Sequence, residues 1–181
     1  VNEFQKKRYQ SDKITVPVST NLSWMDFYDE TIMNWLEKKC ADTSMPSGLY
    51  RMEITETSYA AIEADRSATL EALREAGILL LLDDFGSGYS SFGMLQNYNF
   101  DIMKIDMSFV RQIETNAKTR SIIRFIIEMA HTMDIKIIAE GAETKEQVEF
   151  LRDNGCDYIQ GYYFYKPMPE EEFVKLLDAG R

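Results

Sequence analysis

Six short apolar runs, separated by longer segments of helical spacing, constrain this chain more than any other feature of its sequence. Each run is nearly continuous in apolar residues, which is typical of parallel strands buried on both faces. The runs cover residues 16–22, 49–54, 78–83, 102–105, 136–139 and 158–161. Strand followed by helix, repeated along the chain, predicts a parallel sheet with helices packed against it.

The segments between the runs carry helix signals. Thr144 and Gln147 have the spacing of a capping box, which predicts a helix that begins there. Residues 121–133 have apolar side chains at the spacing of one helix face, with Ile122 and Met133 near its two ends. We therefore expect a helix over 121–133 that buries this face.

Composition excludes several classes of function. No linker, repeat or low-complexity tract divides the sequence, so we expect one domain over residues 1–181. The net charge of -10 argues against binding of duplex nucleic acid. His131 is the only histidine, which excludes a zinc site with two or three histidines. Cys40 and Cys156 are too few for a disulfide scaffold, and no apolar run approaches the roughly 20 residues of a membrane helix.

A polar residue suited to metal binding or proton transfer stands at the end of every predicted strand. These residues are Asn21, Glu53, Asp83 with Asp84, Lys104 with Asp106, Glu140 and Gln160. The strand ends of a closed (β/α) barrel meet at one mouth, whereas an open sheet would spread them along a line. We therefore expect a TIM-like (β/α) barrel, of which six strands are visible.

The residue types at these positions indicate divalent metal ions. Carboxylate and amide oxygens suit Mg²⁺, Mn²⁺ or Ca²⁺. The adjacent carboxylates of Asp83 and Asp84 would repel each other, and a cation would remove that repulsion. Two such ions can hold the attacking and leaving oxygens of a phosphodiester. Lys104, among acidic residues, is expected to keep its charge and to act as an electrostatic partner rather than as a general base.

The residues around these positions closely resemble, in the same order, the motifs of EAL-domain proteins. That family consists of bacterial phosphodiesterases that linearise cyclic di-GMP to pGpG within a (β/α) barrel. The matching stretches are Asn21-Leu22-Ser23, Glu53-Ile54-Thr55-Glu56, the nine residues 83–91, Lys104-Ile105-Asp106, Ala139-Glu140-Gly141 and Gln160-Gly161-Tyr162. The resemblance extends from about residue 16 to the last helix.

The resemblance implies a role for each matching residue. The implied metal ligands are Asn21, Glu53, Asp83, Asp84 and Glu140, and the implied catalytic residues are Lys104, Glu140 and Asp84. The implied substrate-binding residues are Gln160, Asp106 and Asn21, and those that position the loop after the third strand are Glu56, Phe85, Gly86, Ser87 and Gly88.

The resemblance also implies cofactors and partners. It implies two Mg²⁺ or Mn²⁺ ions with inhibition by Ca²⁺, and cyclic di-GMP as the substrate. It further implies a homodimer, an upstream GGDEF or sensor module, and a cytoplasmic location in a bacterium, with no membrane insertion by this segment.

One motif of the family is missing from its expected place. The Glu-Ala-Leu motif of an early strand supplies a metal-binding glutamate, but Glu71-Ala72-Leu73 lies within a predicted helix and cannot replace it. We therefore expect the first two barrel strands to lie outside this sequence. Two other readings stay open: an EAL-type receptor or interaction module without catalysis, and another oxygen-ligated hydrolase or lyase barrel.

Overall fold

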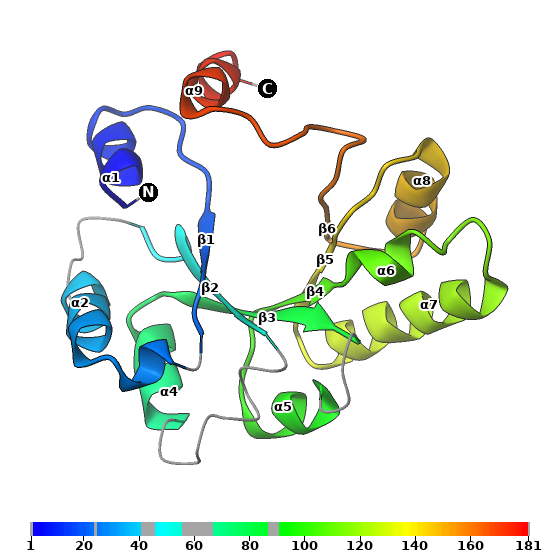
Figure 1. Cartoon of the computed structure of the whole chain (residues 1–181), viewed down its shortest axis with the longest axis horizontal. Coiled ribbons are helices and arrows are strands. Elements are labelled where there is room, and N and C mark those ends of the chain that lie inside the picture. Colours follow the sequence, from blue (N-terminus) through cyan, green and yellow to red (C-terminus); the bar gives the residue numbers. More distant parts are fainter. Residues whose placement is uncertain (1, 24, 41–45, 56–66, 87–90, 181) are drawn as a thin grey trace.

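The chain folds into one six-stranded parallel sheet with helices around it (Figure 1). The computed structural model describes residues 2–23, 25–40, 46–55, 67–86 and 91–180. The strands follow one another in the sheet in sequence order. They are β1 (Val18–Asn21), β2 (Tyr50–Thr55), β3 (Leu79–Phe85), β4 (Ile102–Ile105), β5 (Lys136–Ala139) and β6 (Tyr158–Ile159).

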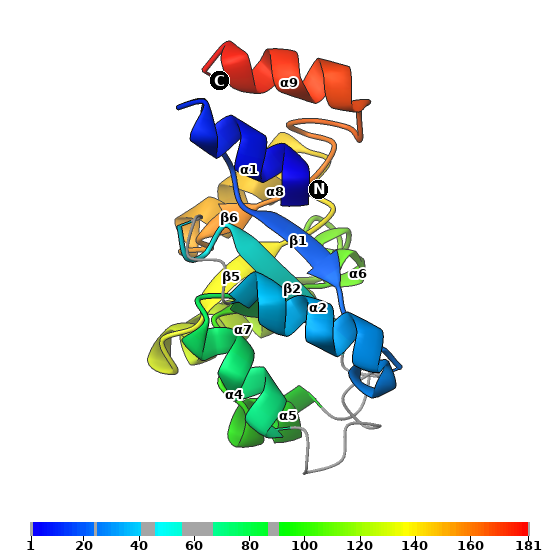
Figure 2. The ribbon, with the colours of Figure 1, turned by 90° about the vertical axis from the view of Figure 1, so that its left-hand side faces the viewer.

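Helices connect the strands and cover the outer face of the sheet (Figures 1 and 2). They are α1 (Asn2–Gln10), η1 (Asp26–Tyr28), α2 (Glu30–Cys40), α4 (Ser67–Glu75), α5 (Ser91–Asn97), α6 (Met107–Val110), α7 (Ala117–Thr132), α8 (Lys145–Asp153) and α9 (Glu170–Asp178). An apolar core fills the space between these helices and the strands. The helices α1 and α9 lie side by side (Figure 2). An ion pair at 2.7 Å joins Arg8 of α1 to Asp178 of α9.

The parallel strand order confirms the predicted strand and helix alternation. Every predicted strand is present, although β1 and β6 are shorter than expected because only Val18–Asn21 and Tyr158–Ile159 pair with a neighbour. Within the described residues β1 and β6 form the two edges and do not pair with each other. The expectation of further strands upstream is not tested by these residues and stays a prediction.

The helix predicted over 121–133 begins earlier, and its buried face is rotated from the expected one, although Ile126 belongs to both and is buried as predicted. Asn116 caps α7, and its side-chain oxygen accepts hydrogen bonds from the N–H groups of Lys118 and Thr119. Ile122 and Met133, expected in the core, are 45% and 43% exposed. The buried residues are Thr119, Ile123, Ile126, Ile127 and Ala130. Two apolar rows run along this helix, one beginning at Ile122 and the other at Ile123. Packing of α7 against β5 buries the row that begins at Ile123.

The capping box predicted before α8 is confirmed. The hydroxyl of Thr144 accepts a hydrogen bond from the N–H of Gln147, while the Gln147 side chain accepts one from the N–H of Thr144. These bonds satisfy backbone donors that the first turn of a helix leaves free. The helix therefore begins at a fixed residue, five positions after Glu140.

Candidate metal centre

Three carboxylates from different strands meet at the amino group of Lys104. Its Nζ lies 2.9 Å from Glu53 Oε2, 2.9 Å from Asp83 Oδ1 and 2.9 Å from Glu140 Oε1. Glu53 is on β2, Asp83 on β3, Lys104 on β4, and Glu140 directly follows β5. In a flat sheet β2 and β5 would be about 14 Å apart, three strand spacings. The sheet therefore curls as a barrel does, which confirms the TIM-like prediction.

A break in the regular pairing of β3 brings both aspartates to the same centre. Neighbouring residues of a regular strand point to opposite faces of the sheet. Here the register between β3 and β4 shifts between Leu82 and Phe85, and Asp84 has a φ of +57°. One carboxylate oxygen each of Asp83, Asp84 and Glu140 consequently lies within 4.8 Å of the others. The strand continues past both aspartates, so they do not end it as the sequence suggested.

The electrostatics of the cluster favour cations. Burial alone would lower the pKa of Lys104, but hydrogen bonds to Asp83, Glu140 and Glu53 outweigh it and raise that pKa. Burial raises the pKa of Glu140, with partial relief from Lys104. Burial, followed by repulsion from Asp83, raises the pKa of Asp84. The one ammonium thus leaves these carboxylates short of positive charge. The raised pKa of Lys104 agrees with the expectation that this residue keeps its charge.

The donor set fits a divalent metal ion. Asp83 is buried, Asp84 and Glu140 are half-buried, and all offer hard carboxylate oxygens at one point. Glu53, Asp83, Asp84 and Glu140 can carry four negative charges against one on Lys104, which leaves an excess of three. Cations of charge +2 would offset this excess.

The neutral predicted residues lie around the carboxylates. Asn21 pairs with Glu53 in the register of β1 and β2, so it stands beside the cluster. The backbone of Gln160, which follows β6, donates to Ala139 O at 2.9 Å and accepts from Ala142 N at 3.1 Å. The backbones of Asn21 and Gln160 therefore lie at the ends of the two edge strands, on either side of the centre.

Asp106 has a structural function that its sequence position did not indicate. Its Oδ1 accepts a hydrogen bond from the N–H of Ser108 at 2.9 Å and caps α6. Its charge nevertheless contributes to the raised pKa of Asp84, after burial and Asp83. Asp106 therefore lies close enough to act electrostatically on the cluster.

The loop predicted to position the site is described only in part. Glu56, Ser87 and Gly88 lie outside the described residues. Phe85 is buried, and its ring meets that of Phe92 edge to face at 6.0 Å. Gly86 has a φ of +92°, and a Cβ there would come within 2.7 Å of the Phe109 ring.

Two glycines of the site have a role that the sequence predictions did not assign. Gly141 has a φ of +74°, and a Cβ there would lie 2.6 Å from Met107 Cβ. A Cβ on Gly161 would come within 2.1 Å of Ala142 O. Each glycine directly follows a predicted site residue, Glu140 or Gln160, and this adjacency was the available signal.

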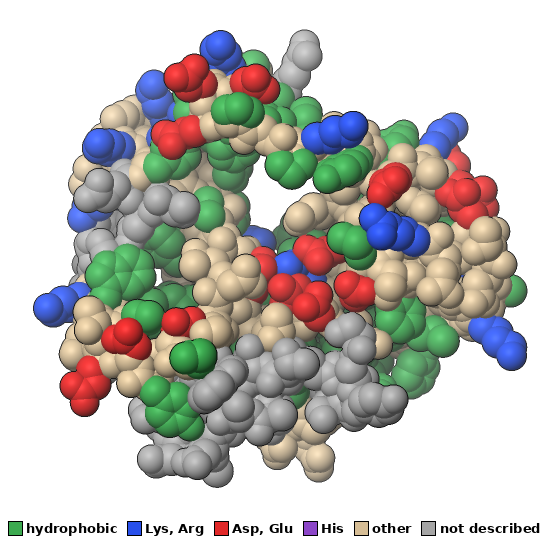
Figure 3. Space-filling view, viewed as in Figure 1, with side chains coloured by type: hydrophobic (Ala, Val, Ile, Leu, Met, Phe, Trp, Pro, Cys, Tyr) green, Lys and Arg blue, Asp and Glu red, His purple; other side chains and the backbone are tan. Residues whose placement is uncertain are grey.

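The space-filling view shows acidic and basic side chains gathered near the middle of one face, beside a hollow (Figure 3).

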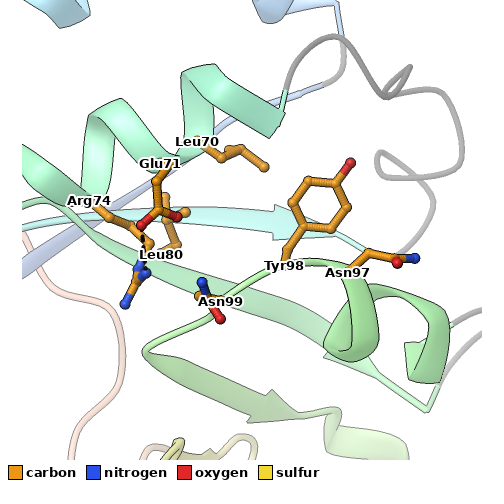
Figure 4. A pocket seen from close by; sticks show the side chains of 7 residues that line it. All are labelled: Leu70, Glu71, Arg74, Leu80, Asn97, Tyr98 and Asn99. Carbon is orange, nitrogen blue, oxygen red and sulfur yellow. Dashed lines mark hydrogen bonds and ion pairs between the residues drawn. The ribbon is translucent and has the colours of Figure 1, made fainter.

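A separate cavity of about 260 Å³ lies between α4, the start of β3 and the end of α5 (Figure 4). It is lined by Leu70, Glu71, Arg74, Leu80, Asn97, Tyr98 and Asn99. None of the carboxylates around Lys104 lines that cavity, so it is distinct from the centre. The residues 71–73 belong to α4, as predicted, and Glu71 forms an ion pair with Arg74 at 3.4 Å.

No helix in the described part of the chain combines the length and the apolar character needed to cross a membrane.

Comparison with known proteins gives a consistent family assignment. A family model described as the EAL domain matches residues 1–167. The signaling protein YkoW of Bacillus subtilis is 32% identical over 160 residues, which is 88% of this chain and 20% of YkoW. The cyclic di-GMP phosphodiesterase NbdA of Pseudomonas aeruginosa is 43% identical over 112 residues, 62% of this chain and 14% of NbdA. This chain thus spans about a fifth or less of the length of these relatives.

Solved structures agree with the sequence matches. The EAL domain of Mycobacterium smegmatis DcpA has a TM-score of 0.87 and 27% identity, covering 98% of this chain and 80% of that domain. BlrP1 of Klebsiella pneumoniae, solved as a manganese and cyclic di-GMP complex, has a TM-score of 0.76 and 27% identity. That match covers 88% of this chain and 41% of BlrP1.

Proposed function

The chain belongs to the EAL-domain family, and from this premise we propose that it hydrolyses one phosphodiester bond of cyclic di-GMP to give pGpG. The observation that carries the proposal is the convergence of Glu53, Asp83 and Glu140 on Lys104. The relative NbdA, named a cyclic di-GMP phosphodiesterase, supports the choice of substrate.

We propose that Mg²⁺ or Mn²⁺ ions bind Asp83, Asp84 and Glu140, with Glu53 and Asn21 as further ligands. Bound metal would polarise the phosphodiester and lower the pKa of attacking water. The manganese complex of BlrP1 supports this choice of ion. Ca²⁺ tolerates looser oxygen geometry than Mg²⁺, so we expect it to occupy the site and inhibit turnover.

Lys104 and the neutral residues would act directly on substrate. The Lys104 ammonium, held by three carboxylates, cannot serve as a base while protonated, and its charge suits contact with water or phosphate. Gln160 and Asn21, on either side of the carboxylates, offer amide donors for phosphate or sugar oxygens. Asp106 would add a hydrogen-bond acceptor at the edge of the site.

Product analysis tests this function. The full-length protein, including the expected upstream strands, is incubated with cyclic di-GMP and Mg²⁺ or Mn²⁺, and pGpG is measured by chromatography. We expect Asp83→Ala to abolish turnover, while Asp153→Asn, on an exposed ion pair with Arg152, leaves it unchanged. Retained turnover in Asp83→Ala would contradict the assignment of the centre.

A second arm separates hydrolysis from a non-catalytic receptor. Calorimetry with cyclic di-GMP and Ca²⁺ measures binding, and Mg²⁺ or Mn²⁺ then replaces Ca²⁺ for turnover. Binding together with pGpG formation supports the proposal. Binding without pGpG would contradict hydrolysis and favour the receptor.

We extend the proposal to a homodimer in the bacterial cytoplasm that works beside a GGDEF or sensor module. Exposed apolar side chains support the dimer: Phe92 on α5 is 64% exposed, and Ile122 and Phe125 on α7 are 45% and 60% exposed. The greater length of the relatives supports the accompanying module, and the scarcity of cysteine supports the location. Light scattering of wild type and Phe125→Asp tests the dimer; a wild-type monomer would contradict it.

A further inference from the structure

The short helix α6 packs against the segment that follows β5. A Cβ on Gly141 would lie 2.6 Å from Met107 Cβ and 3.5 Å from Met107 Cα, so Met107 fills the space beside this glycine. Gly141 has a φ of +74° and directly follows Glu140. The first residue of α6 is therefore in contact with the backbone next to one carboxylate of the centre.

The same helix packs against the segment that follows the two aspartates of β3. A Cβ on Gly86 would lie 2.7 Å from Phe109 Cε2 and 3.0 Å from Phe109 Cζ. Gly86 comes two residues after Asp84, and Phe109 also packs against the apolar core, which holds its ring in place. Residues two apart on a helix point about 200° away from each other. Met107 and Phe109 therefore make contacts on two different sides of α6.

These contacts matter because β3 and β5 do not pair with each other. Each pairs with β4, and the register between β3 and β4 shifts where Asp83 and Asp84 stand. Regular strand pairing alone consequently does not fix the distance from these aspartates to Glu140, although their carboxylate oxygens lie within 4.8 Å of one another. The helix α6 is anchored at the end of β4, where Asp106 caps it, and it touches the segments on both sides.

We propose that α6 is a spacer that sets the distance from the carboxylates of Asp83 and Asp84 to that of Glu140, and thereby decides which divalent ion the centre prefers. This inference rests on the proposed function and deepens it. Met107 and Phe109 are positioning residues, because neither offers a hard oxygen ligand and each acts through the backbone that it contacts.

The chemistry of the ions explains why spacing selects between them. Mg²⁺ needs a nearly ideal octahedron with oxygens at about 2.0–2.1 Å, whereas Ca²⁺ accepts more oxygens at about 2.3–2.6 Å in a flexible arrangement. A centre whose ligands are held at a fixed spacing can favour the smaller ion. A centre that is free to widen loses Mg²⁺ and still holds Ca²⁺.

Calorimetry on the full-length protein with Mg²⁺ and with Ca²⁺ tests the spacer, and the ratio of the two Kd values is the readout. The test variants are Phe109→Leu, which removes the ring atoms nearest Gly86, and Met107→Gly, which removes the Cβ beside Gly141. Met107→Ala keeps that Cβ and is the conservative variant. Ser108→Gly gives α6 the same backbone freedom at an exposed position.

A second control separates spacing from stability. Phe100 is 5% exposed and lies in the core at the opposite end of β4, so Phe100→Leu perturbs a buried ring far from the carboxylates. This variant should lower the melting temperature and keep the wild-type ratio of the two Kd values.

We expect Phe109→Leu and Met107→Gly to raise the Kd of Mg²⁺ about 10- to 100-fold and to leave the Kd of Ca²⁺ nearly unchanged. Met107→Ala and Ser108→Gly should keep the wild-type ratio. If both spacer variants also keep that ratio, the spacer is refuted. If wild type binds neither ion, the proposed function itself fails, which is a different outcome.

A double-mutant cycle tests the contact with Gly86 in EDTA, without any metal. Gly86→Ala places a Cβ where the Phe109 ring stands, and leucine lacks the ring atoms that this Cβ would meet. Gly86→Ala should therefore lower the melting temperature less in the Phe109→Leu protein than in wild type. Equal shifts in the two backgrounds would refute the part given to Phe109.

Discussion

Lys104 Nζ and Glu140 Oε1 lie 2.9 Å apart where β4 and β5 end side by side. The side chain of Lys104 is 6% exposed and that of Glu140 is 18% exposed, so water screens this pair weakly. The same ammonium also contacts Glu53 and Asp83. One cation therefore links a carboxylate of β2, a carboxylate of β3 and the carboxylate that follows β5.

Removal of that cation should destabilise the metal-free protein. In Lys104→Met the buried carboxylates lose their partner, and we expect a loss of about 3–5 kcal/mol of unfolding free energy. Urea denaturation in EDTA measures this loss, and added Mn²⁺ should recover part of it. The control Lys145→Met removes an exposed pair with Glu149 and should cost less than about 1 kcal/mol. Equal stability of both variants in EDTA would contradict the role given to Lys104.

Binding of a metal ion should release more protons at mildly acidic pH than at neutral pH. The pKa values of Asp84 and Glu140 are raised, chiefly by burial, so these groups hold protons at higher pH than ordinary carboxyl groups. Mn²⁺ binds the deprotonated form and must displace those protons. Calorimetry in buffers of different ionisation enthalpy should therefore show weaker binding and more proton release from neutral to mildly acidic pH. In Glu140→Gln both the affinity for Mn²⁺ and the number of protons released should fall. If the affinity of the wild-type protein for Mn²⁺ did not depend on pH, the raised pKa values of Asp84 and Glu140 would be excluded.

Asp157 should stabilise the fold at the opposite end of β5. Burial alone would raise its pKa, but hydrogen bonds from Lys136, His131 and the N–H of Ile137 lower it to about 2. A lowered pKa means that the charged form stabilises the fold above the ordinary value of 3.8, and that this contribution disappears as pH falls through about 2.

Asp157→Asn should accordingly cost about 1–2 kcal/mol near neutral pH, a value reduced for the exposure of Lys136 and His131. Urea denaturation at a series of pH values should show the two proteins converging under acidic conditions. Asp153→Asn, whose carboxylate is 63% exposed, serves as the control and should leave stability nearly unchanged. A difference that persists at the lowest pH would contradict an electrostatic origin.

The strands and the centre could be predicted because both follow from local patterns. Continuous apolar runs fix a parallel sheet, and acidic residues at the ends of neighbouring strands must meet once that sheet curls. The face of α7 could not be predicted, because Ile122 and Ile123 begin two apolar rows of similar quality and only packing against β5 chooses between them. The register shift of β3 at Asp84 could not be predicted either, because a positive φ at an aspartate leaves no pattern in the sequence.

Gly161 should tolerate no side chain, unlike a glycine in an open position. A Cβ there would lie 2.1 Å from Ala142 O and 2.4 Å from Ala142 N, and backbone atoms cannot move aside as a flexible side chain can. We expect Gly161→Ala to force apart the loops after β5 and β6, to lower unfolding free energy by about 1–3 kcal/mol, and to reduce turnover by displacing Glu140 and Gln160.

The matched control is Gly93→Ala on α5, where a Cβ meets nothing within 4 Å. Alanine favours a helix over glycine by about 0.5–1 kcal/mol, so this variant should be slightly more stable than wild type. Thermal denaturation and pGpG formation, measured on both variants, give the comparison. If Gly161→Ala keeps wild-type stability and turnover, the loops after β5 and β6 are not locked together through this contact.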